Sequence, residues 1–317
     1  MMRSNRSTLR AATAAALIFA ACAALACGGR RADVEVIEVG GREREYVLHV
    51  PEAQDPTTPR PLLLVLHGHG GKGPSTPRLT GMDAVADREG FLAAYPSGVG
   101  KSWADGRGVT EADRSGVDDV AFLTALVERI AKAHAVDRQR VYVVGISNGG
   151  FMTQRLLMQR PDVFRGGVVV IATLSARQLD KFKPTSPARF AMINGTEDPL
   201  VAYDGGKAGR DDDGISTDQT IALWRTTNGC ADAPDDRETI DEVDDDTRVE
   251  ILSWSSSCAH APVRLIRVVG GGHTWPGGSQ YLPRAVIGRV SRELDAQEQV
   301  WRFLSEPHTP RASEDGK

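Results

Sequence analysis

One serine of the chain lies in a setting that suits nucleophilic chemistry. Ser147 is the centre of a G-x-S-x-G pentapeptide at 145–149, which follows an apolar run at 141–145 and precedes a segment of helical periodicity at 148–160. A serine that attacks a carbonyl carbon must stand clear of its neighbours on a sharp strand-to-helix turn, where glycine fits on both sides. The N-terminal N–H groups of the helix then favour a developing oxyanion. The pattern predicts Ser147 as a nucleophile; the alternative is a glycine-rich turn with an ordinary surface serine.

A nucleophilic serine needs a base, and the base needs an acid that orients it. After such a turn, the acid precedes the histidine in the chain, and each stands at the end of a later strand. The apolar run at 190–194 leads into a polar turn with Glu197 and Asp198. Asp198 is the predicted acid and Glu197 the alternative. Of the seven histidines, only His273 combines this order with a loop at the end of a strand, so it is the predicted base.

The oxyanion of acyl transfer needs two N–H donors from the backbone. The residue after the nucleophile, Asn148, supplies one. The glycine-rich loop at 66–71 supplies the other, for which we choose the N–H of His69. The side chains of His67 and His69 are also candidate metal ligands, but the loop offers no third one. We expect His67 to support the loop through a hydrogen bond, with neither a metal nor a cofactor in the site.

Strand and helix patterns alternate around these residues. After two β-rich segments within 34–50, continuous apolar runs predict buried strands at 61–66, 91–95, 141–145, 168–172, 190–194 and 263–269. Apolar residues at helical spacing predict helices at 117–134, 148–160 and 294–304. Strands that alternate with such helices form a mainly parallel sheet with helices on both faces. The predicted fold class is therefore α/β, of the α/β-hydrolase type, with one domain at 34–306 and a disordered tail at 307–317.

Two acidic stretches, at 207–214 and 231–247, lack apolar periodicity. Runs of acidic residues are usually solvated, so we predict that both stretches are surface loops. A calcium loop at 241–246 is the alternative for the second, but it lacks the ligand spacing and the turn glycine of such loops.

The first 27 residues are typical of an export leader. Three arginines (Arg3, Arg6 and Arg10) precede an apolar stretch at 11–26 that ends in small residues. This stretch is short for a membrane span, which leaves a retained N-terminal anchor as the alternative. The sequence around Cys27 resembles a bacterial lipobox, and Cys22 is a second candidate for lipidation. Ordinary cleavage would instead release a secreted protein without a lipid.

The composition is that of a globular protein, with 317 residues, 41% hydrophobic residues and a formal net charge of −4. Basic residues are spread along the chain rather than gathered in a block, so we expect no nucleic-acid partner. Only Cys230 and Cys258 follow the leader. Export to an oxidising compartment favours a disulfide between them, with two buried free thiols as the alternative.

Several motifs, taken in order, resemble those of the poly(3-hydroxybutyrate) depolymerase-like esterases, a family that also contains feruloyl and acetylxylan esterases. The resemblance spans roughly residues 34–306 and rests on these segments: Leu66-His67-Gly68, Tyr95-Pro96-Ser97-Gly98, Ser102-Trp103, Val117-Asp118-Asp119, Gly145-Ile146-Ser147-Asn148-Gly149-Gly150, Asn194-Gly195-Thr196-Glu197-Asp198 and Gly272-His273-Thr274-Trp275-Pro276-Gly277.

The resemblance implies an exported α/β-hydrolase that cleaves carboxylic esters. It assigns the same nucleophile, acid and base as above, and it pairs Cys230 with Cys258. It also marks Asp118 and Asp119, which we expect to organise loops beneath the site; a solvated helix N-terminus is the alternative. One departure is His69, where such enzymes often carry cysteine or a small residue. Another is that no substrate-binding module follows the domain, which favours a small or oligomeric ester over a solid polymer.

The function that we expect is therefore that of an exported serine esterase of a bacterium, either secreted or anchored by a lipid. Its candidate substrates are hydroxyalkanoate oligomers or esters of plant-wall type. Trp275 and Trp103 are candidate walls of a substrate pocket; core packing is the preferred interpretation for Trp103 and an equal alternative for Trp275. The rival functions are a serine peptidase or acyltransferase of the same fold, and a catalytically silent surface lipoprotein. The sequence predicts no oligomeric state.

Overall fold

The computed structural model describes residues 33–52, 55–209 and 211–310. The predicted leader, with Cys22 and Cys27, lies outside the described residues, and so does the part of the predicted tail at 311–317. In the described part of the chain, no helix is long and apolar enough to cross a membrane.

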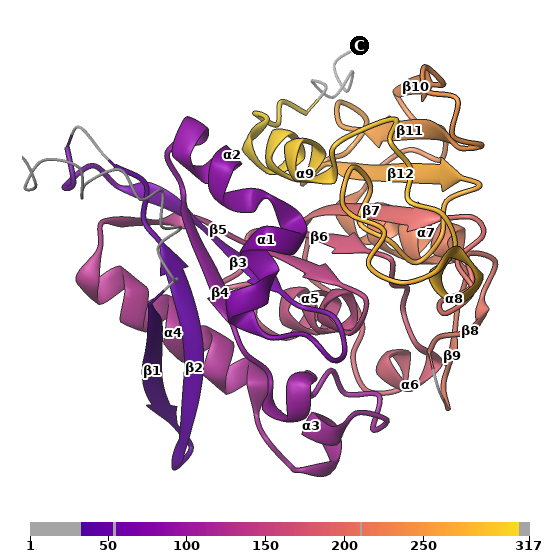
Figure 1. The fold of residues 1–317 in the computed structure, drawn as a ribbon. Helices are drawn as coiled ribbons and strands as arrows, with labels where there is room; N and C mark the ends of the chain where they lie inside the picture. Colours follow the sequence, from indigo (N-terminus) through magenta and orange to yellow (C-terminus); the bar gives the residue numbers. More distant parts are fainter. Residues whose placement is uncertain (1–32, 53–54, 210, 311–317) are drawn as a thin grey trace, which may run out of the picture. The chain divides into compact units, whose positions relative to one another are not determined.

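Ten strands of the described chain form one sheet in the order β1-β2-β4-β3-β5-β6-β7-β12-β11-β10 (Figure 1). The six inner strands are parallel to one another: β4 (Leu92–Pro96), β3 (Arg60–Leu66), β5 (Val136–Ile146), β6 (Gly166–Val170), β7 (Arg189–Gly195) and β12 (Val263–Val269). Strands that are buried on both faces read as unbroken apolar runs, and β3, β4 and β6 are buried along their whole length. The predicted α/β-hydrolase fold with a mainly parallel sheet is confirmed.

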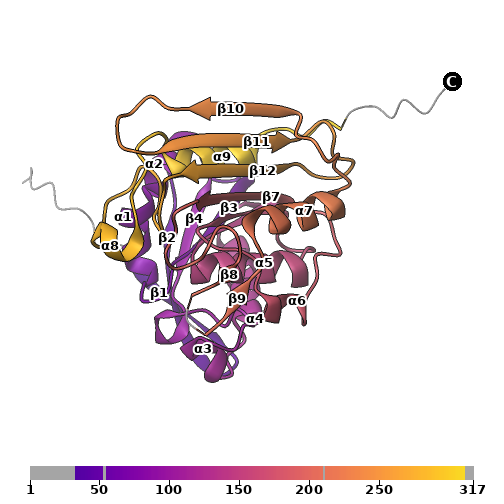
Figure 2. The same ribbon diagram turned by 90° about the vertical axis from the view of Figure 1, so that its right-hand side faces the viewer.

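Two antiparallel strands close each side of the sheet. β1 (Val34–Val39) and β2 (Arg42–His49) form a hairpin on one side, and β11 (Arg248–Trp254) and β10 (Asp236–Ile240) continue the sheet beyond β12 on the other (Figure 2). β10 lies within the acidic stretch that we predicted to be a loop, and that prediction is wrong for these residues. β10 is an edge strand, and four of its five residues are exposed, so its sequence carries no apolar alternation.

The other acidic stretch also contains short strands. β8 (Gly206–Lys207) and β9 (Asp213–Gly214) pair as a separate small hairpin. The pairing involves only two residues of each strand, which is too short for a periodic pattern to reveal.

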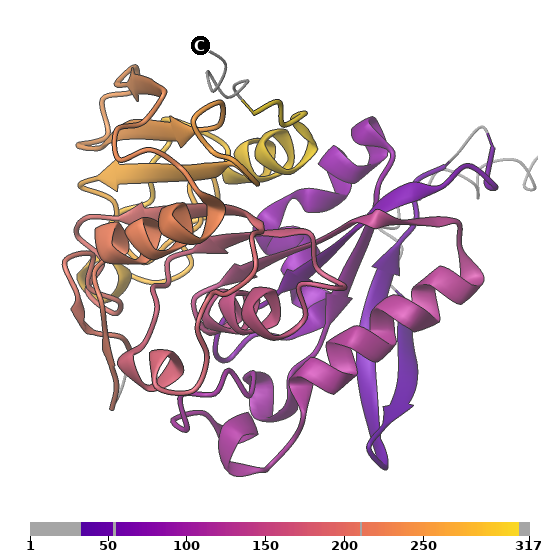
Figure 3. The same ribbon diagram turned by 180° about the vertical axis from the view of Figure 1, so that it is seen from behind.

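Helices cover both faces of the large sheet. α4 (Asp119–Ala133), α5 (Asn148–Gln159) and α7 (Thr217–Asn228) lie on one face (Figure 3), and α2 (Met82–Glu89) and α9 (Ala296–Ser305) lie on the other. The predictions of α4, α5 and α9 are confirmed with shifts of one or two residues at most ends. The shorter elements lie in the connecting segments: η1 (Gly73–Ser75), α1 (Thr76–Thr80), η2 (Val99–Lys101), α3 (Glu111–Arg114), α6 (Ala176–Leu179) and α8 (Arg284–Ile287).

The central strands divide their side chains between two cores, because successive residues of a strand point to opposite faces. Leu64 and Leu66 of β3 pack toward α4 and α5, whereas Leu63 and Val65 pack toward α2 and α9. Burying one leucine or phenylalanine side chain stabilises the fold by about 1.5–3 kcal/mol.

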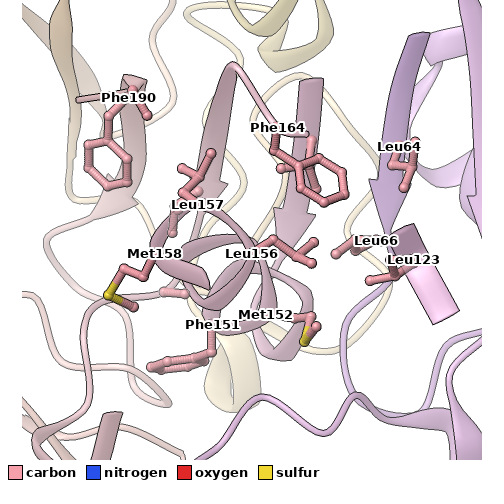
Figure 4. Close-up of a cluster of buried hydrophobic side chains, with 14 of the residues drawn as sticks. Leu64, Leu66, Leu123, Phe151, Met152, Leu156, Leu157, Met158, Phe164 and Phe190 are labelled. Carbon is pink, nitrogen blue, oxygen red and sulfur yellow. The ribbon is translucent and has the colours of Figure 1, made fainter. Parts of the chain in front are cut away.

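Helix α5 packs against the core that contains Leu64 and Leu66 (Figure 4). Phe151, Met152, Leu156 and Leu157 are at most 1% exposed. The helix is thereby held rigidly along its length, and its N-terminal end lies at the carboxyl end of β5, where Ser147 stands.

The structure contains the disulfide between Cys230 and Cys258 that the resemblance implied. The bridge joins the residues after α7 to the turn between β11 and β12.

Replacing both cysteines with serine is expected to lower the free energy of unfolding by about 3 kcal/mol, because the bridge closes a loop of 28 residues in the unfolded chain. Urea unfolding of the wild type and the Cys230→Ser/Cys258→Ser variant measures this difference. Ester turnover at 25 °C should change little, since neither segment supplies Ser147, Asp198 or His273. Equal unfolding midpoints would contradict the prediction.

Candidate active site

Ser147 occupies a strained turn between β5 and α5. Its backbone has φ 53° and ψ −115°, in the positive-φ region that residues with side chains rarely adopt. The Ser147 N–H donates a hydrogen bond to Val170 O at 2.9 Å, which ties the turn to β6. A Cβ at Gly145 would collide with the carbonyl of Gly149, and one at Gly149 would collide with that of Leu66. The glycines that flank the serine are therefore required by close backbone contacts.

A chain of hydrogen bonds leads from this serine to a buried carboxylate. His273 Nε2 lies 2.9 Å from Ser147 Oγ, and His273 Nδ1 lies 2.7 Å from Asp198 Oδ2. The N–H groups of Leu200 and Val201 both donate to Asp198 Oδ1 at 2.8 Å. An acceptor at Nδ1 places the imidazole proton on that atom, which leaves Nε2 free to accept the serine proton.

The sheet brings the acid and the base together. β7 and β12 are parallel neighbours, so the loops that follow them start at the same edge of the sheet. Asp198 and His273 are only 8% and 5% exposed. Glu197, the alternative acid, points away: its carboxylate pairs with Arg289 at 3.3 Å, and its side chain is 63% exposed.

Asn148, the first predicted oxyanion donor, is the first residue of α5 and is buried. The N–H groups at the start of a helix have no intrahelical acceptor, so that of Asn148 is available to a ligand. Its side chain is fixed, because Asn148 Oδ1 accepts the N–H of Trp103 at 2.7 Å and Nδ2 donates to Asp105 Oδ2 at 2.6 Å.

The second predicted donor belongs to the peptide between Gly68 and His69. The Gly68 carbonyl accepts hydrogen bonds from His67 Nδ1 at 2.8 Å and from Gly71 N–H at 3.0 Å. The C=O and N–H of a trans peptide point in opposite directions, so the His69 N–H points away from these donors. Within the described part of the chain it has no hydrogen-bond partner. Gly68 itself lies against the turn, since a Cβ built on it would be 3.5 Å from Ser147 Cβ.

His67 supports this loop, as expected. Burial lowers its pKa to about 4, so the ring is neutral at pH 7. The neutral ring donates from Nδ1 to the Gly68 carbonyl and accepts the Gly98 N–H at Nε2, at 3.0 Å. Across the described residues, no three His, Cys, Asp or Glu side chains are arranged to hold a metal ion.

This lowered pKa makes stability depend on pH. Between pH 6.5 and about 4 the unfolded chain binds a proton at His67 and the folded chain does not, so stability falls as the pH falls. At about 1.36 kcal/mol per pKa unit, lowering the pH from 7 to 4.5 should remove roughly 2–3 kcal/mol through this residue. Urea unfolding at both pH values should show a smaller loss for His67→Gln than for the wild type. His134→Gln, at the end of α4, is the control and should keep the wild-type loss.

The two tryptophans have different surroundings. Trp103 is wholly buried, as core packing requires, and its candidate role as a pocket wall is wrong, because a side chain of 0% exposure does not touch a substrate. Its indole Nε1 donates to His67 O at 2.8 Å, and its ring packs against the His67 ring, so it supports the site from beneath. Trp275 is 2% exposed and donates to Gln297 Oε1 at 3.2 Å. It contributes to the wall of a surface cavity of about 480 Å³ that neither Ser147 nor His273 lines.

Tyr281 is a further residue beside the histidine, and the sequence did not predict it. Its hydroxyl donates to the carbonyl of His273 at 2.9 Å, while 45% of the residue is exposed. Burial of the hydroxyl end and the nearby Asp198 charge raise the pKa of Tyr281 to about 12, so the hydroxyl stays a donor. Leu282 and Val286 follow with 45% and 48% exposure, which places apolar surface beside the histidine loop. No local pattern marks these residues, because they lie in a segment rich in glycine and proline.

The fold and this arrangement of serine, histidine and carboxylate define the class of protein: a serine hydrolase of the α/β-hydrolase fold. The model of the prolyl oligopeptidase family matches residues 85–204.

Proteins that are named as esterases are similar over more of the chain. Putative esterase NocK of Nocardia uniformis subsp. tsuyamanensis is 32% identical over 279 residues, which is 84% of this chain and 81% of that protein. Feruloyl esterase C of Emericella nidulans is 31% identical over 51% of this chain and 58% of its own length. The solved acetyl xylan esterase from Aspergillus awamori covers 82% of this chain and 93% of its own, with a TM-score of 0.56 at 16% identity, and so shares the fold.

The chain therefore belongs to the feruloyl esterase-like family of α/β-hydrolases, and it is a carboxylic-ester hydrolase. The predicted family is confirmed.

Proposed function

We propose that the chain hydrolyses carboxylic esters through a triad of Ser147, His273 and Asp198. The observation that carries this proposal is the continuous hydrogen-bonded chain from Ser147 Oγ through His273 to Asp198, at 2.9 Å and 2.7 Å, at a strained strand-to-helix turn. Strain at a turn persists where the surrounding structure enforces it, which is common at catalytic sites.

The reaction follows from the direction of these hydrogen bonds. His273 Nε2 removes the proton of Ser147 Oγ as the oxygen attacks the ester carbonyl carbon. The N–H groups of Asn148 and His69 stabilise the oxyanion, and Asp198 stabilises the imidazolium. The intermediate collapses, His273 protonates the leaving alcohol, and an acyl-enzyme remains on Ser147. A water molecule, deprotonated by His273, then attacks the acyl-enzyme and releases the carboxylic acid.

The proposed substrates are small or oligomeric esters with an apolar or aromatic part. One relative named above is a feruloyl esterase, and the solved structure that shares the fold is an acetyl xylan esterase. The exposed side chains of Tyr281, Leu282 and Val286 beside the histidine loop offer apolar surface for such a group. Feruloyl and acetyl esters of plant-wall type and hydroxyalkanoate oligomers all satisfy this description.

We also propose that the enzyme is exported. The three arginines and the apolar stretch of the first 27 residues support this, because they have the order of a secretion leader. Lipidation at Cys27 or Cys22 would anchor the enzyme to a membrane, whereas ordinary cleavage would release it. The mass of the mature N-terminus distinguishes the two.

A substrate panel tests the proposed activity. Initial rates are measured side by side on p-nitrophenyl acetate, methyl ferulate, a hydroxybutyrate trimer, acetylated xylan and a prolyl p-nitroanilide. We expect turnover of the esters and the highest kcat/KM on one of the natural ester types. Cleavage of the anilide without ester turnover would overturn the proposal, and no turnover together with no labelling by a fluorophosphonate would indicate a silent protein.

Peptide cleavage is the second candidate, and one observation favours it. The match to the prolyl oligopeptidase family covers residues 85–204, which include Ser147 and Asp198 but not His273. A serine triad can act on amides as well as esters, so the anilide in the panel decides between the two.

A further inference from the structure

Asp105 is a buried carboxylate that the mechanism above does not use. It is 0% exposed and lies in the loop between η2 and α3. Its Oδ2 accepts hydrogen bonds from Asn148 Nδ2 at 2.6 Å and from Arg107 Nε at 3.0 Å, and its Oδ1 accepts the Arg107 N–H at 3.0 Å. A charge buried this completely persists only when it is paired and hydrogen-bonded. Asp105 is both, so its place beside Asn148 is rigidly defined.

We propose that Asp105 is a positioning residue for the oxyanion hole and acts through the side chain of Asn148. This inference rests on the proposed function, because it assumes that the Asn148 N–H binds the oxyanion. Asp105 touches no reacting atom, but through the Asn148 side chain it determines the direction of the Asn148 N–H.

The side chain of Asn148 is held at both ends. Its Oδ1 accepts the Trp103 N–H at 2.7 Å, and its Nδ2 donates to Asp105 at 2.6 Å and to Trp103 O at 3.3 Å. The backbone N–H of Asn148 is at the first position of α5, where no intrahelical bond restrains it. Fixing the side chain therefore restrains the backbone to which it is attached. An oxyanion donor is effective only within about 2.7–3.1 Å of the oxygen, so small rotations reduce catalysis.

The same loop also supports the second half of the proposed hole. Two residues before Asp105, the indole of Trp103 donates to His67 O at 2.8 Å. His67 in turn holds the Gly68 carbonyl, whose peptide carries the His69 N–H. Residues 103–105 thus connect the supports of both proposed donors.

The loop is anchored from two further sides. The Asp119 carboxylate, at the start of α4, accepts the Ala104 N–H at 2.7 Å and pairs with Arg44 at 2.6 Å. This is the organising role beneath the site that we expected for this residue. The Arg107 guanidinium lies over the Phe151 ring of α5, 3.6 Å from its centroid. Because Arg107 is held in this way, the Asp105 carboxylate that pairs with it has little freedom to move.

Charge explains why a carboxylate can stand here. A negative group near the start of α5 would repel the oxyanion, but the Arg107 guanidinium at 2.9 Å from Asp105 Oδ2 offsets its charge. Asparagine at this position would keep the shape but has one acceptor oxygen in place of two, so its NH₂ group would face either Asn148 Nδ2 or the Arg107 N–H, both of which are donors. Arg107 would also lose its nearest anion.

The test compares binding of the substrate with stabilisation of the tetrahedral state. For Asp105→Asn we expect kcat on p-nitrophenyl acetate to fall at least tenfold, with KM within about threefold of the wild type, because only a transition-state interaction is disturbed. Affinity for an alkyl boronic acid, which forms a tetrahedral adduct with the serine, should fall by a similar factor. A kcat within twofold of the wild type would overturn the inference, and so would a rise in KM without a fall in kcat.

A double-variant cycle identifies the route of the effect. Asn148→Ala keeps the backbone N–H and removes the side chain, so it should also lower kcat with little change in KM. Adding Asp105→Asn to it should lower kcat no further, whereas additive effects would show that Asp105 does not act through Asn148. If Asp105→Asn does not fold, Asn148→Ala decides alone, and an unchanged kcat then overturns the inference.

The matched control is another buried carboxylate. Glu293 is 9% exposed and accepts the N–H groups of Glu242 and Val243 at 2.8 Å and 3.0 Å. Glu293→Gln should lower the melting temperature and leave kcat and boronic acid affinity unchanged. If the wild type itself turns over no ester, the proposed function fails; if it does and Asp105→Asn equals it, only this inference fails.

Discussion

Replacing Ser147 with alanine is expected to lower kcat on p-nitrophenyl acetate by about 10⁶-fold, because the variant has no group that can form the acyl-enzyme. KM should change little, since the serine hydroxyl adds almost nothing to ground-state binding. The fluorophosphonate label of the wild type should be absent from the variant. Hydrolysis is followed at 405 nm and labelling by mass spectrometry.

Folding is the first control for this result. Ser147 adopts a positive φ, so alanine at this position should not stabilise the chain, and both proteins should give the same circular dichroism spectrum. Ser115→Ala, at the exposed end of α3, should keep full activity and labelling. Labelling that persists after Ser147→Ala would show that a different residue is the nucleophile.

Replacing Asp198 with asparagine is expected to lower kcat by about 10⁴-fold. The N–H groups of Leu200 and Val201 both require an acceptor at the Oδ1 position, so the asparagine NH₂ must face His273 Nδ1. A donor there forces the imidazole proton onto Nε2, which can then no longer accept the proton of Ser147. Pre-steady-state and steady-state rates on p-nitrophenyl acetate measure the loss.

Glu197→Gln is the matched control for this variant. The two carboxylates are adjacent in the chain, but that of Glu197 faces solvent and pairs with Arg289 at 3.3 Å. We expect kcat within twofold of the wild type. A large loss in Glu197→Gln, with little in Asp198→Asn, would exchange the roles of the two residues.

Local pattern predicted the framework of this protein well, because the features concerned are set by neighbouring residues. The apolar run that became β3 is covered on both faces of the sheet, so its composition alone reveals it. The glycines around Ser147 are required by contacts within the strand-to-helix turn and across to Leu66, and the turn has a recognisable sequence. The order of nucleophile, acid and base follows from the order of the strands that carry them.

Predictions failed or remained open where a residue's role depends on what lies opposite it. The acidic residues of β10 form a strand only because β11 supplies a partner edge, which composition does not show. Tryptophan is a residue type that often lines pockets, yet Trp103 lies beneath His67 and supports the loop that contains it. Tyr281 reaches the histidine loop by folding back over eight residues.

The sequence by itself determined the fold and the family and predicted the nucleophile, since these depend on periodicity and on steric demands within a few residues. The tertiary structure alone showed that the carboxylate of Asp198, the predicted acid, faces His273 and that of Glu197 does not, because only the direction of a side chain separates two adjacent carboxylates. It alone joined Asp105 to Asn148, which lie 43 residues apart in the chain. A hydrogen bond of 2.6 Å between two such residues is set by the packing of a loop against a helix, and no local pattern encodes that packing.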